Sequence, residues 1–62
     1  MPGAKVNLEQ EALRATEMLK GKIVAAVIRH RESEVLIQFT DGTRLFVDQT
    51  PVGVELSITG DN

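Results

Sequence analysis

Apolar residues first recur with a regular period after Asn7, at a spacing that matches the turns of a helix. One narrow stripe is formed by Leu8, Ala12, Ala15 and Leu19, as expected for an amphipathic helix. Asn7 is a favourable N-cap, and Gln10 stands where it could complete a capping box. Gly21 is suited to the position just beyond the helix. The pattern predicts a helix over Leu8–Lys20.

The next segment, Lys22–Arg31, is rich in β-branched residues and is apolar on both sides of an extended chain. In a strand, Ile23, Ala25 and Val27 would point one way and Val24, Ala26 and Ile28 the other. A strand that is apolar on both faces normally lies inside a sheet that is covered on both sides. We therefore expect a central strand here, followed by a charged turn over residues 31–34.

Two further strands flank the dipeptide Asp41-Gly42, which is a strong signal for a β-hairpin. They are predicted over Val35–Thr40 and Thr43–Asp48. A connection over Asp48–Gly53 contains Pro51 and leads to a last strand, Val54–Thr59. In that strand apolar and polar residues alternate, which indicates one packed face and one solvated face.

The hairpin has two plausible registers, and the hydrophobic pattern chooses between them. A two-residue loop would pair Thr40 with Thr43 and would mix Arg44 and Asp48 with apolar residues. A three-residue loop pairs Phe39 with Thr43 and requires a left-handed glycine in the turn. In that register one face holds Val35, Ile37, Phe39, Thr43, Leu45 and Val47, and the other holds Leu36, Gln38, Thr40, Arg44, Phe46 and Asp48. The three-residue loop is therefore predicted.

These elements predict an α+β fold, with one N-terminal amphipathic helix packed on a three- to four-stranded antiparallel β-meander. The alternative is a small curled β-barrel with an N-terminal helix. The whole chain is expected to be a single domain. Its parts are a flexible arm (1–6), the helix (7–20), the meander (22–59) and a tail (60–62).

One helix can cover only one face of such a sheet. We expect it on the face of Val35, Ile37, Phe39, Leu45 and Val47. Leu36, Phe46 and half of the first strand would then lack cover, and exposed apolar patches mark interfaces. Leu36 and Phe46 are therefore candidate interface residues. Leu13 and Met18 fall off the helical stripe on different sides and are further candidates.

Composition strengthens the case for self-association. A chain of 62 residues buries only about 60% of its unfolded surface, and small domains usually need an additional stabilising device. The chain has no cysteine and one histidine, which excludes disulfides and the usual zinc sites. Association of copies is the device that remains.

The charged and titratable residues offer one weak site. Arg29, His30, Arg31 and Arg44 could form an anion-binding cluster, since guanidinium groups match phosphate oxygens. The ordinary alternative is a solvated strand end neutralised by neighbouring acids. His30 could act as a general base, but no nucleophile stands at a recognised spacing. We therefore expect no enzymatic activity, no cofactor and no metal.

No feature of the sequence indicates a membrane or a secretory route. The longest apolar run is Ile23–Ile28, far shorter than the roughly 20 residues of a membrane span. Residues 1–6 contain no apolar signal region, so a cytoplasmic location is expected. The segment EVLIQFTDGTRLFVD, about a quarter of the chain, is similar to the hairpins of many short bacterial proteins. That similarity carries no functional residue.

The expected function is a small non-enzymatic, homo-oligomeric module for protein interaction or regulation, whose partner is itself or another protein. The alternative is an accessory protein associated with nucleic acid through a basic strand edge. Seven basic against nine acidic residues give a net charge of −2, whereas a freestanding nucleic-acid binder normally has a basic excess.

Overall fold

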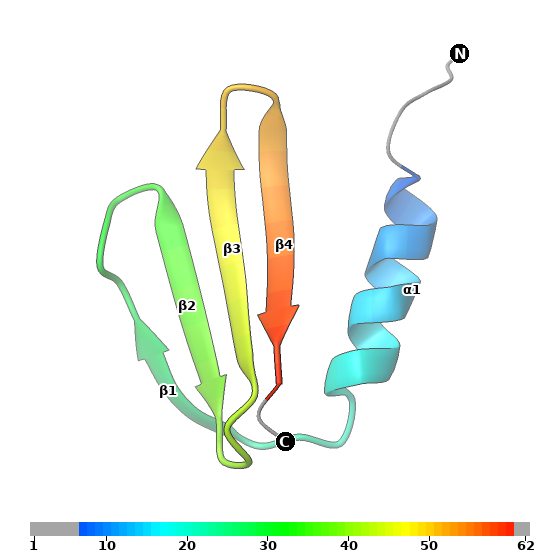
Figure 1. The fold of residues 1–62 in the computed structure, drawn as a ribbon, viewed down its shortest axis with the longest axis vertical. Coiled ribbons are helices and arrows are strands. Elements are labelled where there is room, and N and C mark those ends of the chain that lie inside the picture. Colours follow the sequence, from blue (N-terminus) through cyan, green and yellow to red (C-terminus); the bar gives the residue numbers. More distant parts are fainter. Residues whose placement is uncertain (1–6, 61–62) are drawn as a thin grey trace.

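The computed structural model describes residues 7–60 and consists of one helix and one four-stranded sheet (Figure 1). The predicted arm, residues 1–6, and the end of the tail, residues 61–62, lie outside the described part. The elements in chain order are α1 (Leu8–Leu19), β1 (Val24–Ile28), β2 (Glu34–Phe39), β3 (Arg44–Thr50) and β4 (Gly53–Thr59). The strands pair in the order β1-β2-β3-β4, all antiparallel. The predicted α+β meander is confirmed, and the sheet is open rather than closed into a barrel.

Helix α1 begins and ends as its capping residues indicate. The Asn7 side chain accepts a hydrogen bond from the Gln10 N–H (3.0 Å), which satisfies one of the free donors of the first turn. At the other end the Lys20 N–H donates to the Thr16 carbonyl (2.8 Å). Gly21 then takes a left-handed conformation with φ +84°, which glycine adopts without strain. The helix stops one residue earlier than predicted.

The β2–β3 hairpin has the predicted three-residue loop. The Phe39 N–H donates to the Thr43 carbonyl (2.9 Å), and the Gly42 N–H donates to the Phe39 carbonyl (3.1 Å). Gly42 has φ +95°, and the Asp41 carboxylate accepts from the Thr43 N–H (2.9 Å). The register that separates apolar from polar residues is therefore confirmed.

The β3–β4 connection is much tighter than predicted. Thr50 lies opposite Gly53, so only Pro51 and Val52 form the loop. The Thr50 hydroxyl accepts from the Val52 N–H (3.2 Å) and donates to the Gly53 carbonyl (2.9 Å). The expected long connection over Asp48–Gly53 is wrong, because this hydroxyl closes the turn and lets the ladder continue to its end.

Strand β1 lies at an edge of the sheet, so the prediction of a central first strand is wrong. After α1 the chain runs past the ends of the other strands and reaches the far side of the sheet (Figure 1). Lys22 forms an ion pair with Asp41 of the hairpin turn on this path. The Ile23 carbonyl then accepts from the Thr40 N–H (2.9 Å), which starts the pairing of β1 with β2.

The register of the four strands divides their side chains between two faces. One face, here called the apolar face, is formed by Val24, Val27, Val35, Ile37, Phe39, Leu45, Val47, Val54, Leu56 and Ile58, and the uncharged Gln49 stands on it opposite Val54. The opposite face, here called the mixed face, carries Ala26, Ile28, Glu34, Leu36, Gln38, Arg44, Phe46, Asp48, Glu55, Ser57 and Thr59. Charged side chains of the strands are thus confined to the mixed face.

Helix α1 lies beside β4 and does not extend across the apolar face. In the view down the shortest axis of the molecule the helix overlies no strand (Figure 1). It reaches the sheet only at the margin formed by Leu56 and Ile58, and none of its residues is buried. Leu8, the first residue of the predicted packing stripe, is 72% exposed. The expectation that the helix covers the face of Val35, Ile37, Phe39, Leu45 and Val47 is therefore wrong, because the helix reaches only Leu56 and Ile58 at the β4 margin.

Burial within the described residues is correspondingly slight. Leu36 on the mixed face is the one buried apolar side chain, with 5% of its surface exposed. No helix of the described part is long and apolar enough to cross a membrane.

Candidate interaction surface

The apolar face is built from directly opposed hydrophobic side chains on neighbouring strands. Val35, Val47 and Leu56 form one row across β2, β3 and β4. A second row is formed by Ile37, Leu45 and Ile58. Cross-strand apolar pairs of this kind stabilise a sheet, yet they also present a continuous hydrophobic surface to whatever lies above it.

This surface is open. Its central side chains are only half-buried, and its margins are more exposed still. Val24 and Val27 of β1 are 52% and 60% exposed, and Val54 of β4 is 63% exposed. None of these ten apolar residues is buried. A contiguous apolar patch spread over four strands is typical of an interaction site.

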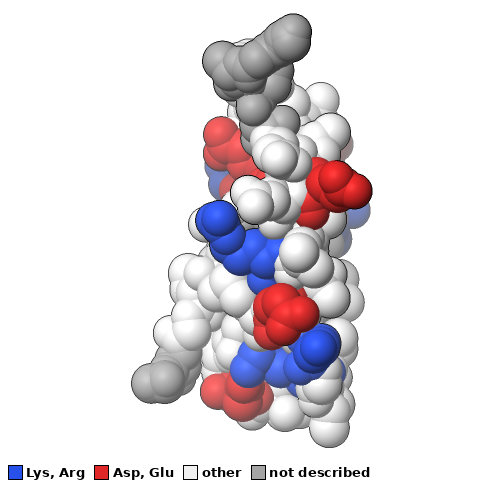
Figure 2. All heavy atoms as spheres, turned by 90° about the vertical axis from the view of Figure 1, so that its right-hand side faces the viewer, with Lys and Arg blue, Asp and Glu red and all other residues white. Residues whose placement is uncertain are grey.

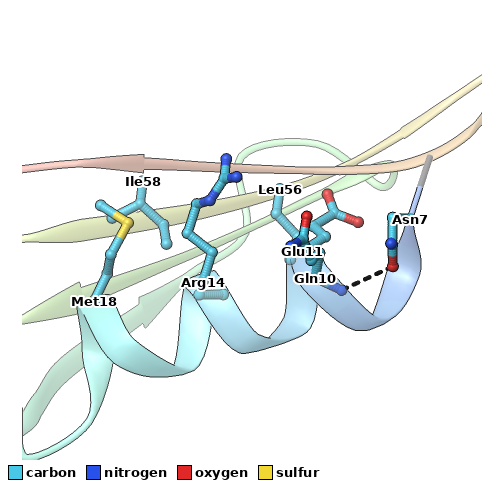
Figure 3. Close-up of a pocket in the computed structure, with 8 residues that line it drawn as sticks. Asn7, Gln10, Glu11, Arg14, Met18, Leu56 and Ile58 are labelled. Carbon is cyan, nitrogen blue, oxygen red and sulfur yellow. Dashed lines mark hydrogen bonds between the residues drawn. The ribbon is translucent and has the colours of Figure 1, made fainter.

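A groove of about 410 Å³ separates helix α1 from β4 (Figure 3). Its apolar lining comes from Ala15 and Met18 of the helix and from Leu56 and Ile58 of the strand. Met18 points toward Ile58, and Arg14 extends from the helix toward β4 (Figure 3). The groove marks where the helix fails to close on the sheet, and it widens the apolar face at this margin.

The outward side of the helix is charged. Acidic and basic side chains alternate along it (Figure 2), and Glu17 pairs with Lys20 at 3.6 Å. Leu13 is 60% exposed and Met18 is 46% exposed, but they do not share a patch. Met18 lines the groove beside β4, whereas Leu13 lies among Glu9, Ala12 and Thr16 on another side of the helix. Of these two candidates, only Met18 adjoins the apolar face.

Leu36 and Phe46 occupy directly opposed positions on the mixed face. The expectation that Leu36 lies uncovered is wrong, because only 5% of its surface is exposed. Ile28 and Phe46 are its cross-strand neighbours on either side, and both are half-buried. Leu36 has almost no surface left for a partner, whereas part of the Phe46 side chain is exposed to solvent.

Three acids form a row across the mixed face. Glu34, Asp48 and Glu55 stand opposite one another on β2, β3 and β4. Partial loss of solvation and the negative charge of Glu34 raise the pKa of Asp48 above its ordinary value. Glu34 is 8% exposed and is partly neutralised by Arg31 at 3.3 Å. Like charges in direct opposition destabilise a sheet.

The basic residues do not assemble into an anion site. The Arg29 guanidinium donates to the Glu34 carbonyl (2.9 Å) and the Glu32 carbonyl (2.8 Å), so it closes the β1–β2 turn. Arg31 pairs with Glu34. Arg44 lies opposite Gln38, four residues along the ladder from Glu34, which is about 13 Å. His30 is exposed in the turn, so the predicted cluster is dispersed.

No group of three or more His, Asp or Glu side chains within residues 7–60 is placed to hold a metal ion. The chain matches no protein-family model, no curated protein and no solved structure. Its function is therefore inferred from the surface of the molecule itself.

The most exposed residues of the apolar face were not among the sequence candidates. Val24, Val27 and Val54 are exposed on the apolar face, and their signal in the sequence is the continuous apolar run over residues 23–28 and the apolar–polar alternation of β4. That signal indicates burial, but it does not say whether the chain itself or a partner provides the cover.

Proposed function

We propose that this chain is a non-enzymatic, self-associating interaction module that buries its apolar face against a second copy. The observation that carries the proposal is the open apolar face, which spans all four strands without a charged side chain. Helix α1 adjoins this face only at its β4 margin.

The thin interior of the subunit supports this proposal. Leu36 is the one apolar residue of the described part that is buried, and the chain has no cysteine for a disulfide. A domain of this size gains roughly 3–5 kcal/mol from a complete core, and here most of the candidate core is at the surface. Burial of the apolar face would supply the missing stabilisation, at about 25 cal/mol per Å² removed from water.

The chemistry of the face suits a second copy. In a two-fold dimer the same patch meets itself, so a face with charges of one sign would repel its mate. The strand residues of the apolar face are uncharged, and the acids of the row Glu34, Asp48 and Glu55 lie on the other side of the sheet. Two such faces can pack as the layers of a β-sandwich.

Sedimentation analysis over a concentration series tests the proposal. The wild-type protein should sediment above its monomer mass of 6.8 kDa at micromolar concentration. Leu45→Lys places a charge in the second row of the apolar face and should shift the distribution toward smaller species. Ser57→Lys adds the same side chain on the mixed face, at an exposed position, and should assemble like the wild type.

A stable 6.8 kDa species whose melting temperature is independent of concentration would contradict the proposal. Equal effects of the two lysine variants would move the interface away from the apolar face. The alternative function, an accessory to nucleic acid, gains no support from the dispersal of Arg29, Arg31 and Arg44. Added nucleic acid should leave the sedimentation pattern unchanged.

A further inference from the structure

Strand β1 is an edge of the sheet whose protection against pairing is limited to a bulge. Edge strands expose a row of unpaired N–H and C=O groups, and proteins usually blunt them with charges, proline or a bulge. From Ile23 to Ile28 the chain has neither a charged residue nor a proline. Val24 and Val27 are more than half exposed.

The backbone groups of two residues of β1 point outward at this edge. Val24 lies opposite Phe39, and Phe39 donates its N–H to Thr43 on the other side, in the hairpin with β3. In an antiparallel ladder the two residues of such a pair turn their polar groups away from each other. Val24 therefore presents its N–H and C=O to solvent. Val27, opposite Ile37, occupies the equivalent position two residues along β2.

The sequence of this edge is a palindrome. Residues 23–28 are Ile-Val-Ala-Ala-Val-Ile. When two copies of this segment run antiparallel about a two-fold axis through its centre, Ile23 meets Ile28, Val24 meets Val27, and Ala25 meets Ala26. Every residue would face a residue of its own type, and cross-strand pairs of β-branched residues stabilise a ladder.

A regular strand could not use this palindrome, because the paired residues would point to opposite faces of the sheet. The register of β1 is shifted between Val24 and Ala26. This bulge moves Val24 to the same face as Val27, since their partners Phe39 and Ile37 are both on the apolar face. A bulge at an edge often prevents pairing. Here it places Val24 of one copy and Val27 of the other on the same face of the sheet, as an antiparallel pair requires.

We propose that β1 pairs with β1 of a second copy, antiparallel and in the register of the palindrome, to form one continuous eight-stranded sheet. This inference rests on the proposed function in that the partner is again the same chain. The two-fold axis stands perpendicular to the sheet, so the apolar faces of both copies lie on the same side.

The pairing also explains how a small face can support assembly. Four strands spaced about 4.8 Å apart and about 20 Å long give a footprint of about 400 Å². Specific interfaces bury about 800 Å² of accessible surface per partner. Joining two sheets through β1 doubles the continuous apolar face, and helix α1 lies at the opposite, β4 margin where it does not obstruct the pairing (Figure 1).

Cysteine cross-linking tests the register, because the chain has no cysteine of its own. Val24→Cys and Val27→Cys are prepared separately, and one of them carries a mass label so that mixed and symmetric disulfide dimers can be told apart. The two variants are then mixed under mild oxidation. In the palindromic register the two positions face each other at about 5.5 Å between Cα atoms, within disulfide range. Identical positions lie about 10 Å apart, beyond that range. The mixed disulfide should form at least about tenfold faster than either symmetric one.

Val54→Cys provides the matched control. Val54 is also an exposed valine of the apolar face, but it lies on β4, at the other margin of the sheet. It should not cross-link to Val24→Cys. A far-ultraviolet circular dichroism spectrum equal to that of the wild type confirms that each variant is folded.

The result separates this inference from the proposed function. Absence of the mixed disulfide, or faster symmetric disulfides, would overturn the β1 pairing even if sedimentation shows assembly through the apolar face. Adding Leu45→Lys to both cysteine variants should reduce assembly through the face and leave the mixed disulfide in place. If the mixed disulfide is lost in lysine variants that remain folded, the contact between the β1 strands depends on the apolar face, and the proposed edge pairing is wrong.

Discussion

Glu34 and Asp48 stand directly opposite each other on β2 and β3, two carboxyl groups in a position where most sheets place an apolar or oppositely charged pair. Glu34 is almost completely buried and has Arg31 as a neighbour. Asp48 has no ion-pair partner within the described residues, and Glu55 adds a third acid on its other side.

This opposition makes stability depend on pH in a definite direction. The pKa of Asp48 is raised in the folded state, so the folded protein binds this proton more tightly than the unfolded chain does. The stabilising contribution is fully present below the unfolded pKa of about 3.9 and is lost as pH rises through the folded pKa. At neutral pH the ionised Asp48 therefore destabilises the sheet.

Asp48→Asn should raise the free energy of unfolding at pH 7, because the amide is uncharged and can accept and donate hydrogen bonds. The gain should shrink as the pH approaches about 3.9, where the wild-type carboxyl becomes protonated. Urea unfolding at fixed protein concentration, at pH 7 and at about pH 3.9, measures the gain in unfolding free energy at each pH. Glu32→Gln, at an exposed acid of the β1–β2 turn, is the control and should change stability less. A gain for Asp48→Asn that is the same at both pH values would contradict the explanation.

Gly42→Val should destabilise the protein by more than about 1 kcal/mol. Gly42 has φ +95°, a conformation that a β-branched residue tolerates poorly. Gly60→Val is the matched control, because Gly60 has no positive φ and an added Cβ there would meet no atom within 4 Å. Denaturant midpoints of the two variants provide the comparison. Equal midpoints would mean that the turn does not hold the register of the hairpin.

The hairpin was predictable because its signals are local. Asp41-Gly42 selects the turn, and the alternation on either side selects the register that keeps Arg44 and Asp48 away from the apolar face. The caps of α1 were predictable for the same reason, since Asn7 and Gly21 act within one helical turn of their own positions.

The arrangement of the elements was not predictable in the same way. A strand that is apolar on both sides satisfies its pattern equally in the middle of a sheet or at an edge that a partner covers, and β1 takes the edge. The stripe of α1 shows that one side of the helix avoids water, but it does not specify which part of the sheet the helix meets. Leu36 became buried because Phe46 and Ile28 flank it on the mixed face.

Leu36→Ala should therefore unfold the subunit rather than weaken its assembly. Removing a buried leucine side chain costs about 2–5 kcal/mol, which is comparable with the roughly 3–5 kcal/mol available to so small a core. The folded signal in circular dichroism should fall at every protein concentration. Val52→Ala, at a residue that is 89% exposed, should change stability by less than about 0.5 kcal/mol. A folded Leu36→Ala variant that only dissociates would place Leu36 in the interface instead.

Arg29→Ala distinguishes a structural arginine from an anion-binding one. The guanidinium of Arg29 donates to the carbonyls of Glu34 and Glu32, so its loss leaves both carbonyls of the β1–β2 turn without this donor. The expected cost is about 1 kcal/mol in unfolding free energy, and Arg29→Lys should recover only part of it, because an ammonium lacks the planar fork. Arg44→Ala, at an exposed position of β3, is the matched control and should be close to neutral. Inorganic phosphate should change the melting temperature of the wild type and of all three variants by the same small amount. If instead phosphate raises the melting temperature of the wild type and Arg29→Ala abolishes that rise without lowering stability, Arg29 binds an anion and the turn is held by other contacts.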